Sequence, residues 1–351
     1  MMRSPVPARF SRPFLVSATL CAGVFLAGCG GAKESTAGGP KAPGSSPAAP
    51  LKVSFQLDWY PAPEHGGHYQ ALVKNYYRDG GLDVTIVAGG PGAFGIQKVA
   101  TGEMQFAMGR CDDIIVAVQR GLPLLIVGTQ MQHDPQAIMV HEDSPVKSFR
   151  DLDGKSVMGM PGVNWIAFLQ GHYGINFNVV PLDYGLARFV ADKNFIQQCF
   201  ISNEPYHVGL QGVKARALLI ADGGYDPYRV IFTNKAFART NPEAVRAFVA
   251  ASTRGWVEFL HGDAAEARAR IVQENPSQTP ALMDYSLAAM KRYKLIEGDP
   301  ANGERAGQLL PTRMEELVRI LVHLKILSAP VPLKDFVSFD FVAPEFTTGK
   351  N

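Results

Sequence analysis

The 351-residue sequence has few cysteines and almost no excess of charge, and both shortages exclude classes of protein. Its four cysteines form no Cys-x-x-Cys or His/Cys cluster, so we expect no metal site, and nothing indicates a bound cofactor. Lys and Arg number 34 against 32 Asp and Glu, and Arg3, Arg9 and Arg12 lie in an N-terminal stretch without acidic residues. The rest of the chain is therefore nearly neutral and has no basic stripe, which argues against a nucleic-acid partner.

The sequence also lacks an apolar run of the roughly 20 residues that a membrane-spanning helix needs. What it has instead is an export signal at residues 1–28, with basic residues, then an apolar stretch from Phe14, then Leu26-Ala-Gly-Cys29. The last four residues look like a bacterial lipobox, which implies that Cys29 is lipidated. The alternative is an ordinary signal peptide with an incidental cysteine. Residues 29–50, rich in Gly, Ala, Ser and Pro, predict a flexible tether behind the lipidated Cys29.

Two cysteines, Cys111 and Cys199, remain in the part of the chain that should fold. In an oxidising compartment they could form one disulfide, but two buried free thiols agree equally well with the sequence. The sequence leaves both alternatives open.

From residue 51 the sequence alternates between strand and helix patterns. The expected strands are 52–57, 82–88, 104–108, 124–129, 137–141, 156–160, 179–180, 200–201, 217–220 and 228–232. The expected helices are 67–77, 95–101, 112–120, 164–173, 242–260, 264–274, 280–292 and 312–324. This order predicts mainly parallel sheets covered by helices. We place lobe 1 at 51–140 plus 229–345 and lobe 2 at 141–228, with a ligand cleft between them.

One motif is more specific than this general pattern. Residues 57–69, LDWYPAPEHGGHY, put an Asp-Trp pair after the first strand and a histidine, glycines and a tyrosine before the first helix. Shorter matching segments follow at 77–83, 99–103, 151–155, 203–205 and 241–245. Together they resemble the solute-binding proteins of ABC importers, in the branch that includes thiamine-pyrimidine-precursor and sulfonate binders. The resemblance implies the type II periplasmic-binding-protein fold: two α/β lobes, two hinge crossings and a helical C-terminal part.

We therefore expect a monomeric, lipid-anchored receptor on the periplasmic or extracytoplasmic face of the cell membrane. It would capture a thiamine pyrimidine precursor or a riboflavin-like heterocycle and pass it to an ABC permease. The same branch contains a thiamine pyrimidine synthase that consumes its own histidine and a pyridoxal-phosphate lysine. Its cysteine cluster is missing from residues 222–229, and 108–113 offer neither lysine nor histidine, so the enzyme is the weaker alternative. Two further alternatives are a sulfonate- or nitrate-type binding protein and a solute sensor for a membrane kinase.

Eight residues are candidate ligand contacts, and no residue is assigned a catalytic role. Trp59 and Trp165, from opposite lobes, could sandwich a flat ring, although each could instead pack into its lobe. Glu204 offers acceptor oxygens to an N–H edge, and Tyr184 could form a further wall. The remaining candidates are Tyr60, His65, Gly90, Asp113 and Asn203. The helix start around Trp165 lacks the hydroxyl groups expected of a sulfonate site, which favours an aromatic or uncharged ligand over a sulfonate.

Overall fold

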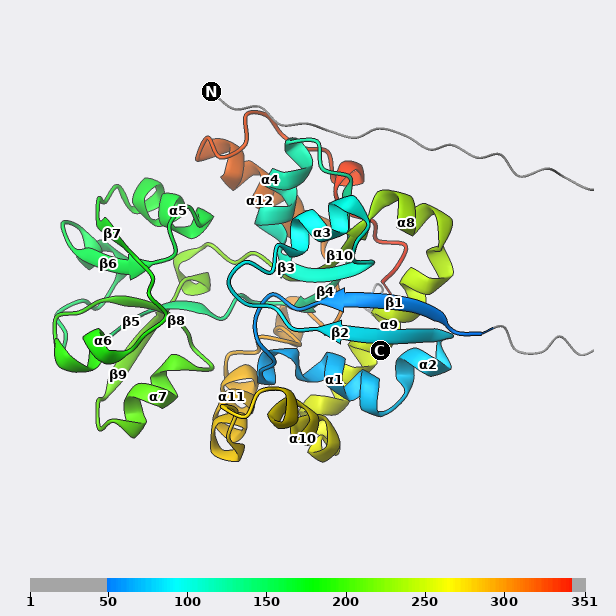
Figure 1. The fold of residues 1–351 in the computed structure, drawn as a ribbon. Helices are drawn as coiled ribbons and strands as arrows, with labels where there is room; N and C mark the ends of the chain where they lie inside the picture. Colours follow the sequence, from blue (N-terminus) through cyan, green and yellow to red (C-terminus); the bar gives the residue numbers. More distant parts are fainter. Residues whose placement is uncertain (1–48, 343–351) are drawn as a thin grey trace, which may run out of the picture. The chain divides into compact units, whose positions relative to one another are not determined.

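The computed structural model describes residues 49–342. The predicted signal peptide (1–28), the lipidated Cys29 and nearly all of the predicted tether lie outside these residues. In the described range, strands and helices alternate and form two five-stranded sheets (Figure 1). The expectation of two α/β lobes is confirmed.

The first sheet has the strand order β2-β1-β3-β10-β4. Its strands are β1 (Leu51–Gln56), β2 (Leu82–Val87), β3 (Phe106–Arg110), β4 (Leu124–Met131) and β10 (Arg229–Asn234). Strand β1 runs parallel to β2 and β3, whereas β10 is antiparallel to both of its neighbours. The sequence predicted mainly parallel sheets, and this is wrong for the half of the first sheet that contains β10. Strand β10 returns from the second sheet and inserts between β3 and β4. It begins at the end of the sheet where those two strands finish.

The second sheet has the order β7-β6-β8-β5-β9. Its strands are β5 (Gln136–His141), β6 (Ser156–Gly159), β7 (Asn178–Pro181), β8 (Gln197–Phe200) and β9 (Ala215–Leu219). Strand β5 pairs antiparallel with β8 and β9, so it belongs to this sheet. The first crossing between the sheets therefore lies before β5, at residues 132–135, and not at the predicted boundary after residue 140. The second crossing, 220–228, joins β9 to β10.

Helices cover both faces of each sheet (Figure 1). Those around the first sheet are α1 (Gly66–Val73), α2 (Tyr76–Asp79), α3 (Gly95–Thr101), α4 (Cys111–Gln119), α8 (Lys235–Thr240), α9 (Pro242–His261), α10 (Ala265–Glu274), α11 (Pro280–Arg292) and α12 (Pro311–His323). Those of the second are α5 (Asn164–Tyr173), α6 (Ala187–Ala191) and α7 (Glu204–Leu210). The helix predicted at 67–77 is split into α1 and α2 because Asn75 adopts the left-handed conformation, with φ of 61°.

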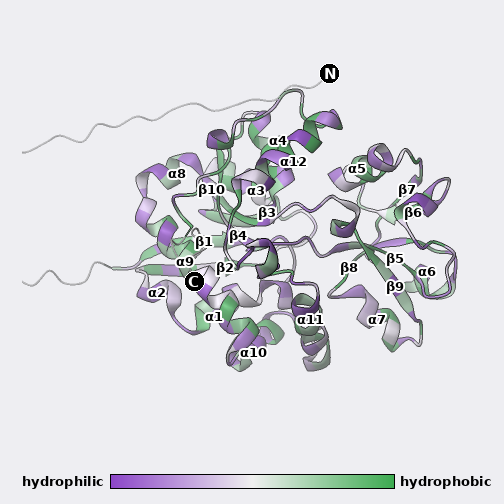
Figure 2. Ribbon diagram, turned by 180° about the vertical axis from the view of Figure 1, so that it is seen from behind, coloured by the Kyte–Doolittle hydropathy of each residue, from purple (hydrophilic) through white to green (hydrophobic). Residues whose placement is uncertain are grey.

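Helix α12 shows why these segments are helical. Its buried residues Met314, Leu317, Val318 and Leu321 recur at helical spacing and pack into an apolar cluster with α4. Its other residues are largely polar, and Figure 2 shows hydrophobic and hydrophilic residues side by side on the helices that flank the sheets. Among residues 49–342, no helix is both long enough and apolar enough to cross a lipid bilayer.

Helices α1 and α9 pack very closely, and glycine makes this possible. A Cβ atom on Gly255 would lie 2.1 Å from the carbonyl oxygen of Gly67 and 2.9 Å from the Cβ of Ala71. Backbone atoms cannot yield as the end of a flexible side chain can, so an added methyl group must push the two helices apart. The close approach buries Trp256 and Phe259 of α9 against the start of α1.

We expect Gly255→Ala to lower the free energy of unfolding by about 1–3 kcal/mol through overpacking. Gly209 in helix α7 is the matched control, because a Cβ there would meet nothing within 4 Å. Gly209→Ala should raise stability by up to about 1 kcal/mol, since alanine favours a helix over glycine. Urea unfolding followed by circular dichroism measures both changes. Equal effects of the two substitutions would contradict the close α1–α9 packing.

Candidate functional site

Polar side chains gather at one edge of the first sheet, by which we mean the line across the ends of its strands. Strands β1, β3 and β4 end at this edge, and β10 begins there because it runs antiparallel. The register between β3 and β10 pairs Arg110 directly with Arg229. Both side chains are buried, with exposed fractions of 6% and 7%. Two guanidinium groups shielded from water at one sheet edge need carboxylate partners, and the loops that follow the strands supply them.

Arg229 is held by two aspartates, Asp58 in the first lobe and Asp134 in the first crossing. Its Nη1 donates to Oδ2 of Asp58 at 2.5 Å and its Nη2 to Oδ1 of Asp134 at 3.4 Å. Burial alone would raise the pKa of Asp58, but the hydrogen bond from His65 and the charge of Arg229 hold it below its usual value. The Arg229 guanidinium also lies 4.8 Å from the ring centroid of Phe200, at the end of β8. Arg229 thus contacts groups of both lobes.

His65 is buried, and both of its ring nitrogens are occupied. The backbone N–H of Ala62 donates to Nδ1 at 3.1 Å, which leaves Nε2 to donate to Oδ1 of Asp58 at 3.1 Å. The sequence proposed His65 as a ligand contact. In the structure its side chain orients Asp58, which in turn holds Arg229.

Arg110 is the centre of a second set of polar contacts, which joins the two lobes. Its Nη2 donates to Asp112 at 3.2 Å and to Asp113 at 3.3 Å. From the second lobe, the Asn164 amide donates to the same carboxylates at 2.8 and 3.4 Å. Tyr225, in the second crossing, donates to Asp112 at 2.7 Å. Partial desolvation and the neighbouring Asp112 carboxylate raise the pKa of Asp113, whose side chain is 45% exposed. The other oxygen of Asp112, Oδ1, is buried without a hydrogen-bond partner.

Two glutamates, the buried Glu64 and the half-buried Glu204, approach each other from opposite lobes. Glu64, at the start of the first helical region, accepts a hydrogen bond from the hydroxyl of Ser202 in the second lobe. Glu204 accepts from the Phe200 N–H at 2.7 Å and from the Asn203 amide at 3.4 Å. Burial raises the pKa of Glu64, and it raises the pKa of Glu204 to about 7. Asn203 and Glu204, both predicted ligand contacts, therefore also bind each other in the turn that opens α7.

Aromatic rings meet where the two lobes face each other. The Trp59 ring lies 5.2 Å from that of Tyr184 in the second lobe, at an interplanar angle of 32°. It also lies 5.4 Å from the Tyr60 ring at 72°. Trp165 is only 1% exposed and packs in the core of the second lobe, although its Nε1 has no partner. The ring that faces Trp59 across the lobes is thus Tyr184, and not Trp165 as predicted.

Gly90 supports this aromatic group. It has a φ of 131°, and a Cβ atom there would lie 2.9 Å from the Tyr60 ring. The loop therefore needs glycine both for its backbone conformation and for the close approach of the tyrosine. The structure thus brings Trp59, Tyr60 and Gly90 together, and it brings Asp113 beside Asn164.

The sequence reasoning missed the polar core of the site, namely the charged residues Asp58, Glu64, Arg110, Asp112 and Arg229 and the amide of Asn164. Asp58 and Arg110 could have been found by looking for charged residues at the ends of apolar strands. Arg229 could not, because its role depends on the antiparallel register of β10. Among the described residues, no three His, Cys, Asp or Glu side chains are grouped closely enough to hold a metal ion.

Two surface cavities lie away from this edge. One, of about 460 Å³, is formed by the end of α9 and by α10 and α11, and includes His261, Arg268 and Lys291. The other, of about 330 Å³, lies beside the crossings between the lobes and includes His133, Asp226 and Lys294.

Comparison with known proteins identifies relatives over most of the chain. The model of the family described as NMT1/THI5 like matches residues 62–266. The riboflavin-binding protein RibY of Chloroflexus aurantiacus is 29% identical, over 86% of this chain and 92% of its own length. The formylaminopyrimidine-binding protein of Halalkalibacterium halodurans is 23% identical, over 93% and 98%. The 4-amino-5-hydroxymethyl-2-methylpyrimidine phosphate synthase of Candida albicans is 26% identical, over 58% and 66%.

Solved structures agree on the fold. The alkanesulfonate-binding protein SsuA from Xanthomonas axonopodis pv. citri, bound to MOPS, superposes with a TM-score of 0.61 at 17% identity. The match covers 84% of this chain and 99% of that protein. At this identity the likeness concerns the fold, which is that of the periplasmic binding proteins. The fold and the family resemblance expected from the sequence are confirmed.

Proposed function

Because the chain belongs to the NMT1/THI5 like family, we propose that it is the solute-binding receptor of an ABC importer for a flat heterocycle. The ligand class is a thiamine pyrimidine precursor or a riboflavin-like molecule, as the names of two relatives suggest. The observation that carries the proposal is the pair of Trp59 and Tyr184, which brings aromatic rings of the two lobes within 5.2 Å of each other. Movement of the lobes would admit a planar ring between them, with stacking on each face.

The charges of the site support an uncharged ligand over a sulfonate or nitrate. Four aspartates surround the two buried arginines: Asp58, Asp112, Asp113 and Asp134. Both arginines are therefore already neutralised, and an anion would meet uncompensated carboxylates. The unpartnered oxygen of Asp112 suits an N–H group on the edge of a pyrimidine or a flavin.

The same proposal includes export and attachment to the membrane. Periplasmic binding proteins with this fold act outside the cytoplasm, and a lipid on Cys29 would keep the receptor near its permease. The tether of residues 29–50 would leave the folded part free to reorient. The receptor acts as a monomer and has no nucleic-acid partner.

A panel of thermal-shift and calorimetric titrations tests the ligand class. The panel contains riboflavin, thiamine, aminopyrimidines, taurine and nitrate. A ligand present at about 100 times its dissociation constant should add about 2.7 kcal/mol of stability. Binding of a heterocycle supports the proposal. A shift produced by taurine or nitrate alone would refute the uncharged-ligand assignment.

For a heterocycle that binds, we expect Trp59→Ala to weaken affinity about tenfold, or about 1.4 kcal/mol, through loss of stacking area. Trp59→Phe keeps an aromatic face at the same position and should retain most of the affinity. Isothermal titration calorimetry compares the two variants with the wild type. Unchanged binding by Trp59→Ala would place the ligand away from the aromatic pair.

A second candidate function is that of a pyrimidine phosphate synthase, the activity named for the Candida albicans relative. It predicts that the protein binds pyridoxal phosphate and releases a changed product. Absorbance spectra with added pyridoxal phosphate, and mass spectrometry of the ligand after incubation, separate the two functions. Recovery of the ligand unchanged supports the receptor.

A further inference from the structure

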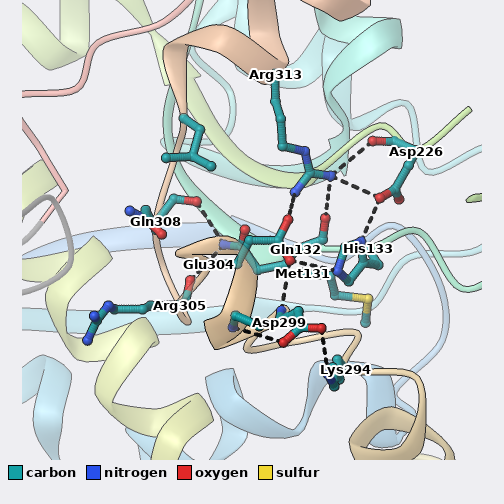
Figure 3. Close-up of polar contacts among 12 residues, drawn as sticks. Met131, Gln132, His133, Asp226, Lys294, Asp299, Glu304, Arg305, Gln308 and Arg313 are labelled. Atoms are coloured by element: carbon teal, nitrogen blue, oxygen red, sulfur yellow. Dashed lines mark hydrogen bonds and ion pairs between the residues drawn. The ribbon is translucent and has the colours of Figure 1, made fainter. Parts of the chain in front are cut away.

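A second polar cluster joins both crossings between the lobes to the C-terminal part of the chain (Figure 3). Its members are His133 in the first crossing, Asp226 in the second, Glu304 after the turn at Pro300–Asn302, and Arg313 in the first turn of α12. We call these four residues the hinge cluster. The hinge cluster touches the candidate ligand site at one point, where the backbone N–H of Asp134 donates to Asp226.

His133 lies between two carboxylates. Its Nδ1 is 2.6 Å from Oδ2 of Asp226, and its Nε2 is 3.0 Å from Oε2 of Glu304. A neutral imidazole has one N–H and one lone pair, so it can donate to only one of these oxygens. Only the protonated ring donates at both ends. With both carboxylates ionised, this geometry fits a positively charged His133.

Arg313 joins the same two carboxylates from the opposite side. Its Nη2 donates to Asp226 at 3.0 Å and its Nη1 to Glu304 at 2.9 Å. Nη2 also donates to the backbone oxygen of Gln132 at 2.8 Å, and the other oxygen of Asp226 accepts from the Asp134 N–H at 2.9 Å. The side chain of Asp226 and the cations beside it thus fix the second crossing to the first.

The charges of the hinge cluster balance only while His133 is protonated. Two cations then face two carboxylates, and loss of the imidazole proton leaves one negative charge without a partner. Further charged groups approach the cluster: Asp299, whose N–H donates to Glu304 at 2.8 Å, and Lys294, which pairs with Asp299 at 2.7 Å. The carboxylate of Asp134 lies in the first crossing, and Arg292 and Asp222 line the neighbouring cavity with His133.

We propose that the hinge cluster is a proton-dependent clamp that holds the two crossings together, and that the lobes separate more readily once His133 is deprotonated. His133 and Arg313 are positioning residues, which act on the cleft through the crossings and do not touch a ligand. The proposal rests on the proposed function only in that the lobes move to admit a solute. Burial lowers the pKa of His133, but Asp226 and Glu304 outweigh it and raise the pKa above its usual value. The clamp should therefore loosen as the pH rises above about 6.5.

The test uses the full chain without any ligand, so its outcome is independent of the ligand class. An NMR titration of the histidine ring signals should give His133 a midpoint shifted above 6.5. Small-angle X-ray scattering between pH 6 and pH 9 should show a reversible rise in the radius of gyration. His133→Gln should abolish that rise and give the larger radius throughout, because glutamine carries no charge at any of these pH values.

His261→Gln is the matched control. His261 also bonds a glutamate, Glu297, at 3.0 Å, but it lies at the end of α9 away from the crossings. This variant should follow the wild type at every pH. A His133 midpoint at or below 6.5, or a radius of gyration that does not change with pH in the wild type, would overturn the proposal. Both readings come from the wild-type protein, so they hold even if His133→Gln does not fold.

Discussion

Replacing Arg229 by methionine should lower the free energy of unfolding by about 3–5 kcal/mol at pH 7. The substitution keeps the length of the side chain but removes the cation bound to Asp58 and Asp134. Two carboxylates then remain at a buried edge without their counter-charge, which costs far more than the bond itself was worth. The urea midpoint, followed by circular dichroism, measures the loss.

The pH dependence of this loss identifies its cause. In the wild type, Arg229 and His65 hold the pKa of Asp58 below its usual value, so this group stabilises the fold above about pH 4. That contribution disappears as the pH falls through the folded-state pKa. The deficit of Arg229→Met should therefore shrink at acidic pH, where the stranded carboxylates become protonated.

Arg319→Met supplies the control for the loss of a guanidinium group. Arg319 pairs with Glu316 at 2.5 Å one turn away on α12, and both side chains are more than half exposed. An exposed pair of this kind contributes at most about 1 kcal/mol. If the two methionine variants lost similar stability, the buried charge network at the sheet edge would not have the role assigned to it.

Glu204→Gln should stabilise the protein by about 2–3 kcal/mol at pH 8 and have little effect below about pH 4.5. Burial raises the pKa of Glu204 to about 7, so the folded state disfavours its charged form. In the wild type, the stability that protonated Glu204 contributes is fully present below pH 4.5 and is lost as the pH rises through 7. Each unit of pKa shift changes the free energy of unfolding by about 1.4 kcal/mol. Glutamine keeps the acceptor for the Phe200 N–H and carries no charge.

The difference in stability between Glu204→Gln and the wild type, measured from pH 4 to pH 8, isolates this one titration. Glu243→Gln is its control, because Glu243 is 85% exposed and pairs only with the partly exposed Arg246. That variant should stay within about 1 kcal/mol of the wild type at every pH. A Glu204→Gln protein less stable than the wild type at pH 8 would indicate a carboxylate that the fold favours in its charged form.

Local patterns in the sequence predicted most of the helices and strands. The helices at 95–101, 164–173 and 280–292 have the same bounds in the structure as in the prediction. Each has a start or an end signal nearby, such as Pro280 at the first helical position and Gly174 in the left-handed conformation after α5. Signals of this kind act within one turn, so they can be recognised without the rest of the fold.

Strand direction and the opposing faces of the site depend on residues far apart in the chain. Nothing in the local pattern of β5 or β10 indicates that these strands run antiparallel to their neighbours. The sequence analysis gives Tyr184 only as a further wall, and its φ of 62° is one that tyrosine rarely adopts. The prediction placed Trp59 correctly at the end of the first strand, yet chose Trp165 over Tyr184 as the ring opposite it.

The thiols of Cys111 and Cys199 are both buried and free, which settles the alternative left open by the sequence. Cys111 begins α4 beside the first sheet, and Cys199 lies in β8 of the second. Folding of residues 49–342 therefore needs no oxidase or disulfide isomerase. The two halves are joined by no covalent bond except the chain itself, so a reducing medium should leave their relative motion unchanged.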